Sequence, residues 1–287
     1  MTHDQLSPFA RKIHLPIKLP VLSKNIPALM QVMADETLDY RGLAHEINNY
    51  PEIAARLLYL ANSAWSAPDS SIADIESACL RLGSSVVRSV SLAIAIGSAF
   101  DTLKCPGFDV HRFWIRCMLV AETATLLVQM GCAQEPVTPK IAHTAGLLHN
   151  IGLLWLVDNL ATETSQALQM TVENPALSLP EALQLTTGAD YAEVGGWLVR
   201  KWQFPEILVV AIEQHLHPSD QGHFHEIAKV IAAATKIAAV VQVGESSLPD
   251  MHLFTVAQID LPAQECLLTK IARQRQQIET IAKVLFN

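Results

Sequence analysis

The chain has 287 residues, half of them hydrophobic and 17% charged, and its 20 basic and 28 acidic side chains give a net charge of −8. So much apolar surface can offset the entropy of ordering, which excludes a disordered chain, and the length suits one large domain or two closely packed ones. The net negative charge argues against a protein that coats nucleic acid or an anionic membrane, so we expect no direct nucleic-acid or membrane partner.

The sequence predicts neither a membrane segment nor an export signal. The longest apolar runs, such as 117–121 and 207–212, are far shorter than the roughly 20 residues that span a bilayer. The first 20 residues lack a continuous apolar segment after their basic residues, so we expect no secretory signal. The five cysteines are widely spaced and form no CxxC pair, which is typical of reduced thiols. We therefore expect a cytoplasmic protein.

Apolar residues recur every three or four positions throughout the chain, which predicts an all-α fold. Asp39 is a good N-cap, with Leu38 and Leu43 at the staple positions on either side of it. Pro51 fits the first turn of the next helix. The apolar stripe of that helix is expected to be Ile53, Leu57, Leu60, Ala61 and Ala64.

The following helices are also marked by capping residues. Ser84 or Ser85 is expected to cap a helix that continues through Ala95. Asp109 is expected to cap a long helix that ends at Gly131, because glycine is the preferred residue just after a helix.

Proline marks the helix starts and breaks in the second half of the chain. Thr138-Pro139 is expected to open the helix that carries the sequence GLLHN. Two more helices are predicted over 191–201 and 206–216, with a break at Pro205 between them.

A domain boundary is expected near residues 104–107 (KCPG). It divides residues 17–245 into an N-terminal helical subdomain (17–104) and a second helical bundle (105–245). Residues 1–16 are then an N-terminal extension, and 246–287 a C-terminal connection and helix. That helix starts near Pro262, and we expect it to dock on its own chain, because a polar stretch at 273–277 interrupts any long coiled-coil seam.

The sharpest local pattern for chemistry is the segment Gly146–Gly152, GLLHNIG. A hydrolytic metal site needs several His or Asp ligands and an open position for water. An adjacent His-Asp pair at the end of an apolar helix would supply two ligands. Here the second residue is Asn150, a weak neutral oxygen donor, and a single His149 is more often a hydrogen-bonded core histidine.

Several longer blocks of the sequence, taken in their order along the chain, carry a resemblance to a known family. In the first half they are LPVLSKNIPALMQVMAD, PEIAARLLYLANSAW and SIADIESACLRLGSSVVRSVSLAIAI. In the second half they are FWIRCMLVAETATLLV, HTAGLLHNIGLLWL, YAEVGGWLVRKWQFPEILVVAIEQHLHP and VIAAATKIA. With these blocks, the stretch from Leu19 to Leu285 resembles the HD-related output domain family (HDOD), a bacterial signalling relative of the HD metal phosphohydrolases.

The resemblance implies that the catalytic residues of the enzymatic relatives are largely missing. Their first histidine corresponds to Arg116, their His-Asp doublet to His149-Asn150, and their distant aspartate to Thr235. A further histidine corresponds to Tyr191. Only His149 remains of the four core ligands, so the resemblance implies no metal, no cofactor and no catalysis. It implies a bacterial signalling module that acts by binding protein partners.

Arg116 supports a second interpretation of the same site. A guanidinium in place of a metal ligand would bring a fixed positive charge into the old cavity, where it could hold a phosphate or a carboxylate. Arg112, one turn earlier, would reinforce that charge. Alternatively, Arg116 pairs with a local acid or extends to solvent.

A second group of histidines follows the helix predicted over 206–216. His215 and His217 match part of an HHxP-type segment of the family, and His223 and His225 come shortly after. Alternating histidines could bind a transition metal or titrate near neutral pH, although a solvated loop with incidental histidines is more common.

Two alternatives to the signalling module therefore stay open. The first is a divergent HD-type phosphohydrolase that uses His149, His215 and His217 in a relocated metal site. The second is a sensor that binds a nucleotide or another phosphorylated small molecule near Arg116 and His149.

Overall fold

A computed structural model describes residues 26–35, 37–63, 71–133, 136–219, 221–243 and 261–286. These residues form helices and connecting turns without a β-strand, so the predicted all-α class is confirmed. The N-terminal extension at 1–16, Ala64 and most of the connection before the C-terminal helix lie outside the described residues.

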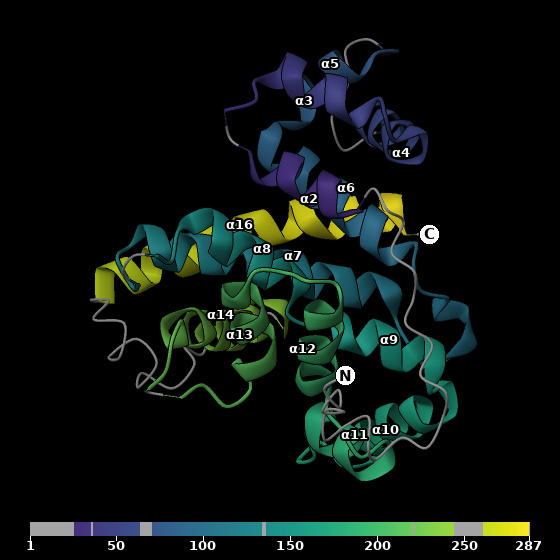
Figure 1. Cartoon of the computed structure of the whole chain (residues 1–287), viewed down its shortest axis with the longest axis vertical. Helices are drawn as coiled ribbons and strands as arrows, with labels where there is room; N and C mark the ends of the chain where they lie inside the picture. The colour runs from purple at the N-terminus through teal and green to yellow at the C-terminus, as the bar shows by residue number, and fades with distance from the viewer. Residues whose placement is uncertain are drawn as a thin grey trace, which may run out of the picture.

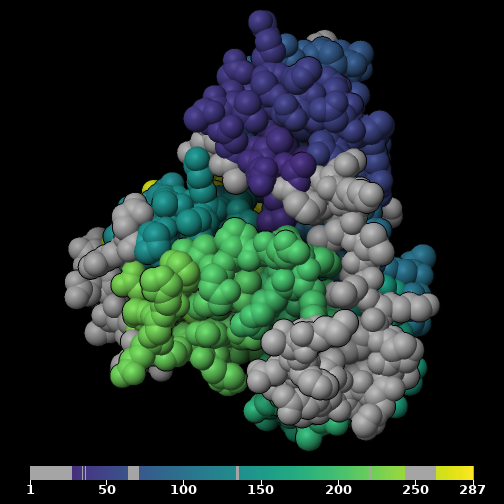
Figure 2. Space-filling model, in the orientation of Figure 1, coloured from purple at the N-terminus to yellow at the C-terminus, as the bar shows by residue number. Residues whose placement is uncertain are grey.

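The first half of the chain forms a small group of helices that stands as a lobe above the rest (Figures 1 and 2). Leu57 and Leu60 of the predicted stripe are fully buried in it. Asp39 caps its helix by accepting a hydrogen bond from the Gly42 amide at 2.8 Å, and Pro51 opens the next helix. The helices are α2 (Ile26–Ala34), α3 (Tyr40–Ile47), α4 (Pro51–Ala61), α5 (Ile75–Leu82) and α6 (Ser84–Gly97).

The expected cap of α6 is wrong. Ser84 and Ser85 lie inside the first turn, and Gly83 precedes the helix without a side-chain cap. Gly83 has a φ of 82° and serves at once as the C-cap of α5 and the N-cap of α6. Because a single residue joins the two helices, no position is left for a separate serine cap.

The second half of the chain forms a larger bundle. Its long helix α7 (Val110–Gln129) is capped by Asp109 and followed by Gly131 at a φ of 83°, as predicted. The helix at 206–216 ends two residues earlier than predicted. The elements are η2 (Thr102–Lys104), α7, α8 (Pro139–Leu148), α9 (Ile151–Asn159), α10 (Ala161–Glu173), α11 (Leu179–Thr186), α12 (Tyr191–Lys201), α13 (Glu206–Gln214) and α14 (His225–Val243).

The C-terminal helix α16 (Leu261–Leu285) runs across the molecule between the lobe and the bundle (Figure 1). It packs along α7 and also contacts α14 and α4. Arg56 of α4 donates a hydrogen bond to the Leu285 carbonyl at 3.0 Å, and the rings of Trp114 and Phe286 stack at 5.2 Å. The helix therefore docks on its own chain, as its interrupted apolar seam predicted. Its buried apolar residues are Leu267, Ile271, Ile278, Ile281, Ala282 and Leu285.

Two glycines let the helices of the bundle approach closely enough to form the site described below. A Cβ on Gly146 of α8 would lie 2.6 Å from the Ala121 Cα of α7. A Cβ on Gly152 of α9 would lie 2.1 Å from the Tyr191 carbonyl oxygen and 2.4 Å from the Gly195 nitrogen of α12. These contacts leave no room for any side chain, so glycine is required at both crossings.

Membrane-spanning potential is low in the part of the chain that the structure describes. Within it, no single helix combines the length and hydropathy of a bilayer span, and α5 with α6 reaches that length only as a pair bent by 113°.

Candidate functional site

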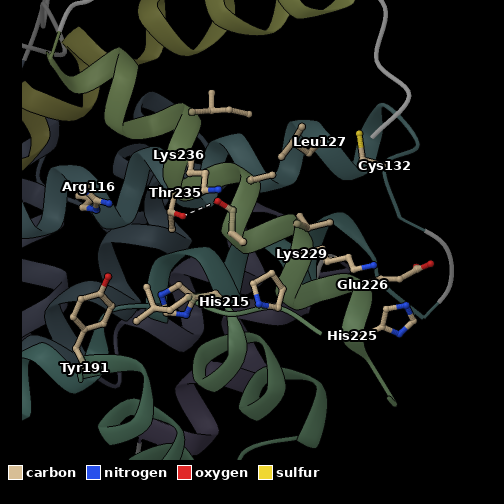
Figure 3. A pocket seen from close by; sticks show the side chains of 16 residues that line it. Arg116, Leu127, Cys132, Tyr191, His215, His225, Glu226, Lys229, Thr235 and Lys236 are labelled. Atoms are coloured by element: carbon tan, nitrogen blue, oxygen red, sulfur yellow. Dashed lines mark hydrogen bonds between the residues drawn. The ribbon is translucent and has the colours of Figure 1, made fainter. Parts of the chain in front are cut away.

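A cavity of about 520 Å³ opens between α7, α12, the end of α13 and α14 (Figure 3). Helix α7 contributes Arg116 and α12 contributes Tyr191, while His215 follows the last residue of α13. The α14 wall runs from His225 to Ile237. Three residues that the sequence assigned to one site, Arg116, Tyr191 and His215, thus come from distant parts of the chain to one cavity.

Helix ends position the two histidines of the site. His149 is the C-cap of α8 and is fully buried, and Asn150 directly behind it is the N-cap of α9. His215 is the C-cap of α13, lines the cavity and is 2% exposed. A polar side chain at a helix end can reach a backbone carbonyl that the helix leaves free, and both histidines use this bond.

Each histidine is bonded through Nδ1 to the carbonyl three residues earlier. His149 Nδ1 lies 2.7 Å from the Gly146 oxygen, and His215 Nδ1 lies 2.8 Å from the Ile212 oxygen. A carbonyl oxygen can only accept, so Nδ1 carries the proton in both rings and Nε2 of a neutral ring is a bare acceptor. Neither Nε2 has a hydrogen-bond partner among the described residues, and neither does the buried Asn150 Oδ1.

The rings of His149, His215 and Tyr191 pack together at the wall of the cavity. The rings of His149 and His215 meet edge to face with centroids 5.3 Å apart. Tyr191 stacks on the other side of His215 at 5.9 Å, and its hydroxyl points toward Arg116 (Figure 3). The imidazole of His215 is therefore fixed in orientation by a ring on each side.

Burial is the main cause of the pKa shifts of His149, His215 and Tyr191. It lowers the pKa of His215 to about 4 and the pKa of His149 well below its usual 6.5, and the positive charge of Arg116 lowers both further. The hydrogen bond to the Ile212 carbonyl opposes the shift at His215 only in part. Burial also raises the pKa of Tyr191 to about 12. At neutral pH both imidazoles are uncharged and the phenol keeps its proton.

These shifts predict that the folded protein loses stability in mild acid. In the unfolded chain an imidazole takes up a proton near pH 6.5, whereas folded His215 stays neutral until about pH 4. The free energy of unfolding should therefore fall by about 2 kcal/mol between pH 6.5 and 5 from this residue, and His149 acts in the same direction. Urea unfolding of wild type and His215→Gln at several pH values measures this. An equally flat profile for both proteins over that range contradicts it.

Arg116 brings a positive charge to the cavity without a partner of its own. It lines the cavity, is half-buried, and forms no hydrogen bond or ion pair with a described residue. Lys229 and Lys236 of α14 line the same cavity, against a single carboxylate, Glu226, which lies beside His225 away from Arg116 (Figure 3). In a chain with a net charge of −8, the cavity is locally positive.

Four residues of the predicted site do not line the cavity: His149 and Asn150, which are buried, and Arg112 and His217, which are exposed. Arg112 is exposed and does not line it. Four residues along a helix add about 40° of rotation and 6 Å of rise. This displacement leaves the Arg112 side chain outside the cavity that Arg116 lines. His217 is also exposed, because α13 ends at Gln214 and the chain then turns outward. A relocated metal site made of His149, His215 and His217 is therefore not assembled.

The residues present do not fit a divalent hydrolytic metal. Within the described ranges, no group of three or more His, Cys, Asp or Glu side chains is placed to hold a metal ion. Thr235, at the expected aspartate position, lines the cavity and donates its hydroxyl to the Ala232 carbonyl at 2.8 Å (Figure 3). Two neutral imidazoles and an amide supply no negative charge to balance a cation.

Sequence reasoning missed the residues of α14. Glu226, Lys229 and Lys236 recur at helical spacing, so a polar stripe on that helix is visible in the sequence. Such a stripe usually faces solvent, and only the packing of α14 against α7 and α13 turns it toward the cavity.

Comparison with known proteins agrees with this architecture. A family model described as the HDOD domain matches residues 19–218, more than half of the chain. The chain belongs to the HDOD family. A comparison with curated proteins gives no significant match.

Solved structures show the same HDOD architecture. A Shewanella amazonensis protein provisionally named a phosphohydrolase is 27% identical, with a TM-score of 0.69, and the alignment covers 93% of this chain and 95% of that one. A Marinobacter aquaeolei protein provisionally named a signal transduction protein has a TM-score of 0.79 at 19% identity, covering 97% and 64%. An HDOD domain protein of unknown function from Geobacter sulfurreducens has a TM-score of 0.69 at 18% identity, covering 93% of each chain.

Proposed function

We propose that this HDOD protein is a non-catalytic regulatory module of a bacterial signalling pathway, which acts in the cytoplasm by binding a protein partner. Membership of the HDOD family supports a signalling role, and one structural neighbour carries the name of a signal transduction protein. The observation that carries the non-catalytic part is Arg116. A fixed cation lines the cavity, at the position that the resemblance assigns to a metal ligand.

The same cavity supports a way of regulating the module. Arg116 lies on α7, which packs against α8, α14 and α16. Helix α16 in turn contacts α4 of the lobe. A ligand at Arg116 that favours one packing of these helices over another would change the surface offered to a partner, to the extent that its affinity for the two arrangements differs.

A comparison of two arginine variants tests this function. Wild type, Arg116→Ala and Arg112→Ala are immobilised at matched circular dichroism, and the proteins that each retains from an extract of the source organism are quantified. Arg112 is the matched control, because it lies one turn away on α7 but outside the cavity. We expect Arg112→Ala to retain the same partners as wild type and Arg116→Ala to retain them with altered affinity.

Two results would count against the proposal. Identical partners and affinities for all three proteins would leave the cavity as scaffold. Retention of no specific protein by wild type, together with turnover of a phosphate ester that Arg116→Ala or His149→Ala abolishes, would favour a divergent phosphohydrolase instead.

A further inference from the structure

We propose that the cavity binds a small phosphorylated molecule and holds its phosphate group, with one proton retained, between Arg116 and His215. This inference rests on the proposed function, because the ligand is to be held and not hydrolysed. The cavity beside Arg116 would then select phosphorylated ligands over other anions.

Arg116 supplies the positive charge of the proposed site. Its guanidinium lines the cavity, is half-buried and is bonded to no described residue. A guanidinium carries five N–H donors in a planar fork that matches two oxygens of an oxyanion. The Tyr191 hydroxyl points toward the same place (Figure 3). Any oxyanion would satisfy this half of the site, including carboxylate and sulfate.

His215 supplies a hydrogen-bond acceptor that has no donor in the described part of the chain. The ring is 2% exposed, lines the cavity, and has its Nδ1 proton committed to the Ile212 carbonyl at 2.8 Å. Nε2 is then a lone pair that exposes less than 1 Å² and has no partner among the described residues, so a ligand reaches it only when the ring shifts toward the cavity. A buried acceptor without a donor is costly, so the ligand that fits must also donate a hydrogen bond at this position.

Few anionic groups meet both requirements. Carboxylates and sulfate are fully ionised at neutral pH and can only accept, so their oxygens would face the His215 lone pair. Inorganic phosphate keeps at least one proton at neutral pH. The second pKa of a phosphate monoester is about 6, so only about a tenth of it is protonated at pH 7, and the rest can take up a proton on binding at a cost of about tenfold in affinity. A phosphate group can therefore pair its charged oxygens with Arg116 and donate its remaining O–H to His215 Nε2.

The rest of the cavity indicates that the ligand is larger than phosphate. At about 520 Å³, the cavity lies within the range of ordinary small-molecule sites. The α14 wall offers apolar contacts through Val230, Ala233 and Ile237, and the same helix adds two lysines, Lys229 and Lys236. An organic phosphate of about nucleotide size, with its non-polar part on α14, matches this lining.

Phosphate and sulfate together form a sharp test, since the two ions have the same shape but only phosphate carries a proton. Calorimetric titration of the intact protein at pH 7 with each ion, and with adenosine monophosphate, measures the three affinities. We expect phosphate to bind about tenfold or more tightly than sulfate and the nucleotide to bind more tightly than phosphate. Equal affinity for phosphate and sulfate, or no binding of phosphate or nucleotide, would overturn the inference.

Variants assign the selectivity to its residues. Arg116→Gln should lose affinity for both ions, whereas Arg112→Gln, the matched control on α7, should retain both. His215→Gln offers an amide N–H in place of the lone pair, so it should gain sulfate affinity and lose the discrimination. Unchanged affinities in Arg116→Gln would overturn the inference. The selectivity of the wild type needs no variant and still tests it if a variant fails to fold.

The release of inorganic phosphate from adenosine monophosphate separates this inference from the proposed function. Binding without release agrees with both. Binding with release that depends on His149 supports phosphate recognition and contradicts the non-catalytic module. Absence of both binding and release contradicts the phosphate site alone.

Discussion

Gly152→Ala should destabilise the protein by about 3 kcal/mol, the upper end of the usual cost of overpacking. The added Cβ would lie 2.1 Å from the Tyr191 carbonyl oxygen and 2.4 Å from the Gly195 nitrogen. Both are backbone atoms, so α9 and α12 can accommodate the methyl group only by moving apart. Because Tyr191 begins α12 and lines the cavity, this movement should also weaken ligand binding.

Gly107→Ala is the matched control for this prediction. The nearest atom to a Cβ there is Leu168 Cδ1 at 3.9 Å, an ordinary contact, so the change should stay within about 0.5 kcal/mol of wild type. Urea unfolding of the three proteins measures the difference. A Gly152→Ala protein as stable as Gly107→Ala would show that the crossing of α9 and α12 is not as close as described.

Removal of residues 263–287 should cost even more, because it uncovers the faces of α7 and α14 on which α16 packs. We expect the truncated protein to aggregate or to melt well below wild type. The single change Ile271→Ala disturbs the same packing less severely. Because Ile271 is fully buried, its truncation should lower the free energy of unfolding by about 2–5 kcal/mol.

Lys270→Ala is the control for Ile271→Ala, since it alters an exposed neighbour on the same helix and should change stability by less than about 0.5 kcal/mol. Thermal melting and size-exclusion chromatography measure both effects. Unchanged melting and solubility of the truncated protein would mean that α16 contributes nothing to the fold.

Much of the fold could be predicted because its signals are local. Asp39, Asp109 and Thr138 each cap a helix by accepting from an amide three residues later, and a contact of that range is visible in the sequence. The cap of α6 could not be predicted in this way. It depends on whether Gly83 adopts a positive φ and joins two helices directly, and that is settled by how α5 and α6 pack.

The candidate site also could be predicted only in part. Resemblance to the HDOD family assigns Arg116, Tyr191 and His215 to one site, and all three line one cavity. Helical spacing predicts Arg112 there, and the same resemblance predicts His217. Both lie outside, because their positions depend on helix rotation and on where α13 ends. The orphan Nε2 of His215 could not be predicted from the sequence, since it follows from the bond that the other ring nitrogen makes.

The loss of the metal centre is the central claim, and metal content tests it most directly. Purified protein is dialysed against Mn, Fe, Zn and Mg salts in turn, and bound metal is measured by elemental analysis for wild type and His149→Ala. The residues at the old ligand positions, Arg116, Asn150 and Thr235, predict far less than one equivalent of any metal and no difference between the two proteins. One equivalent retained by wild type and lost in His149→Ala would contradict the account.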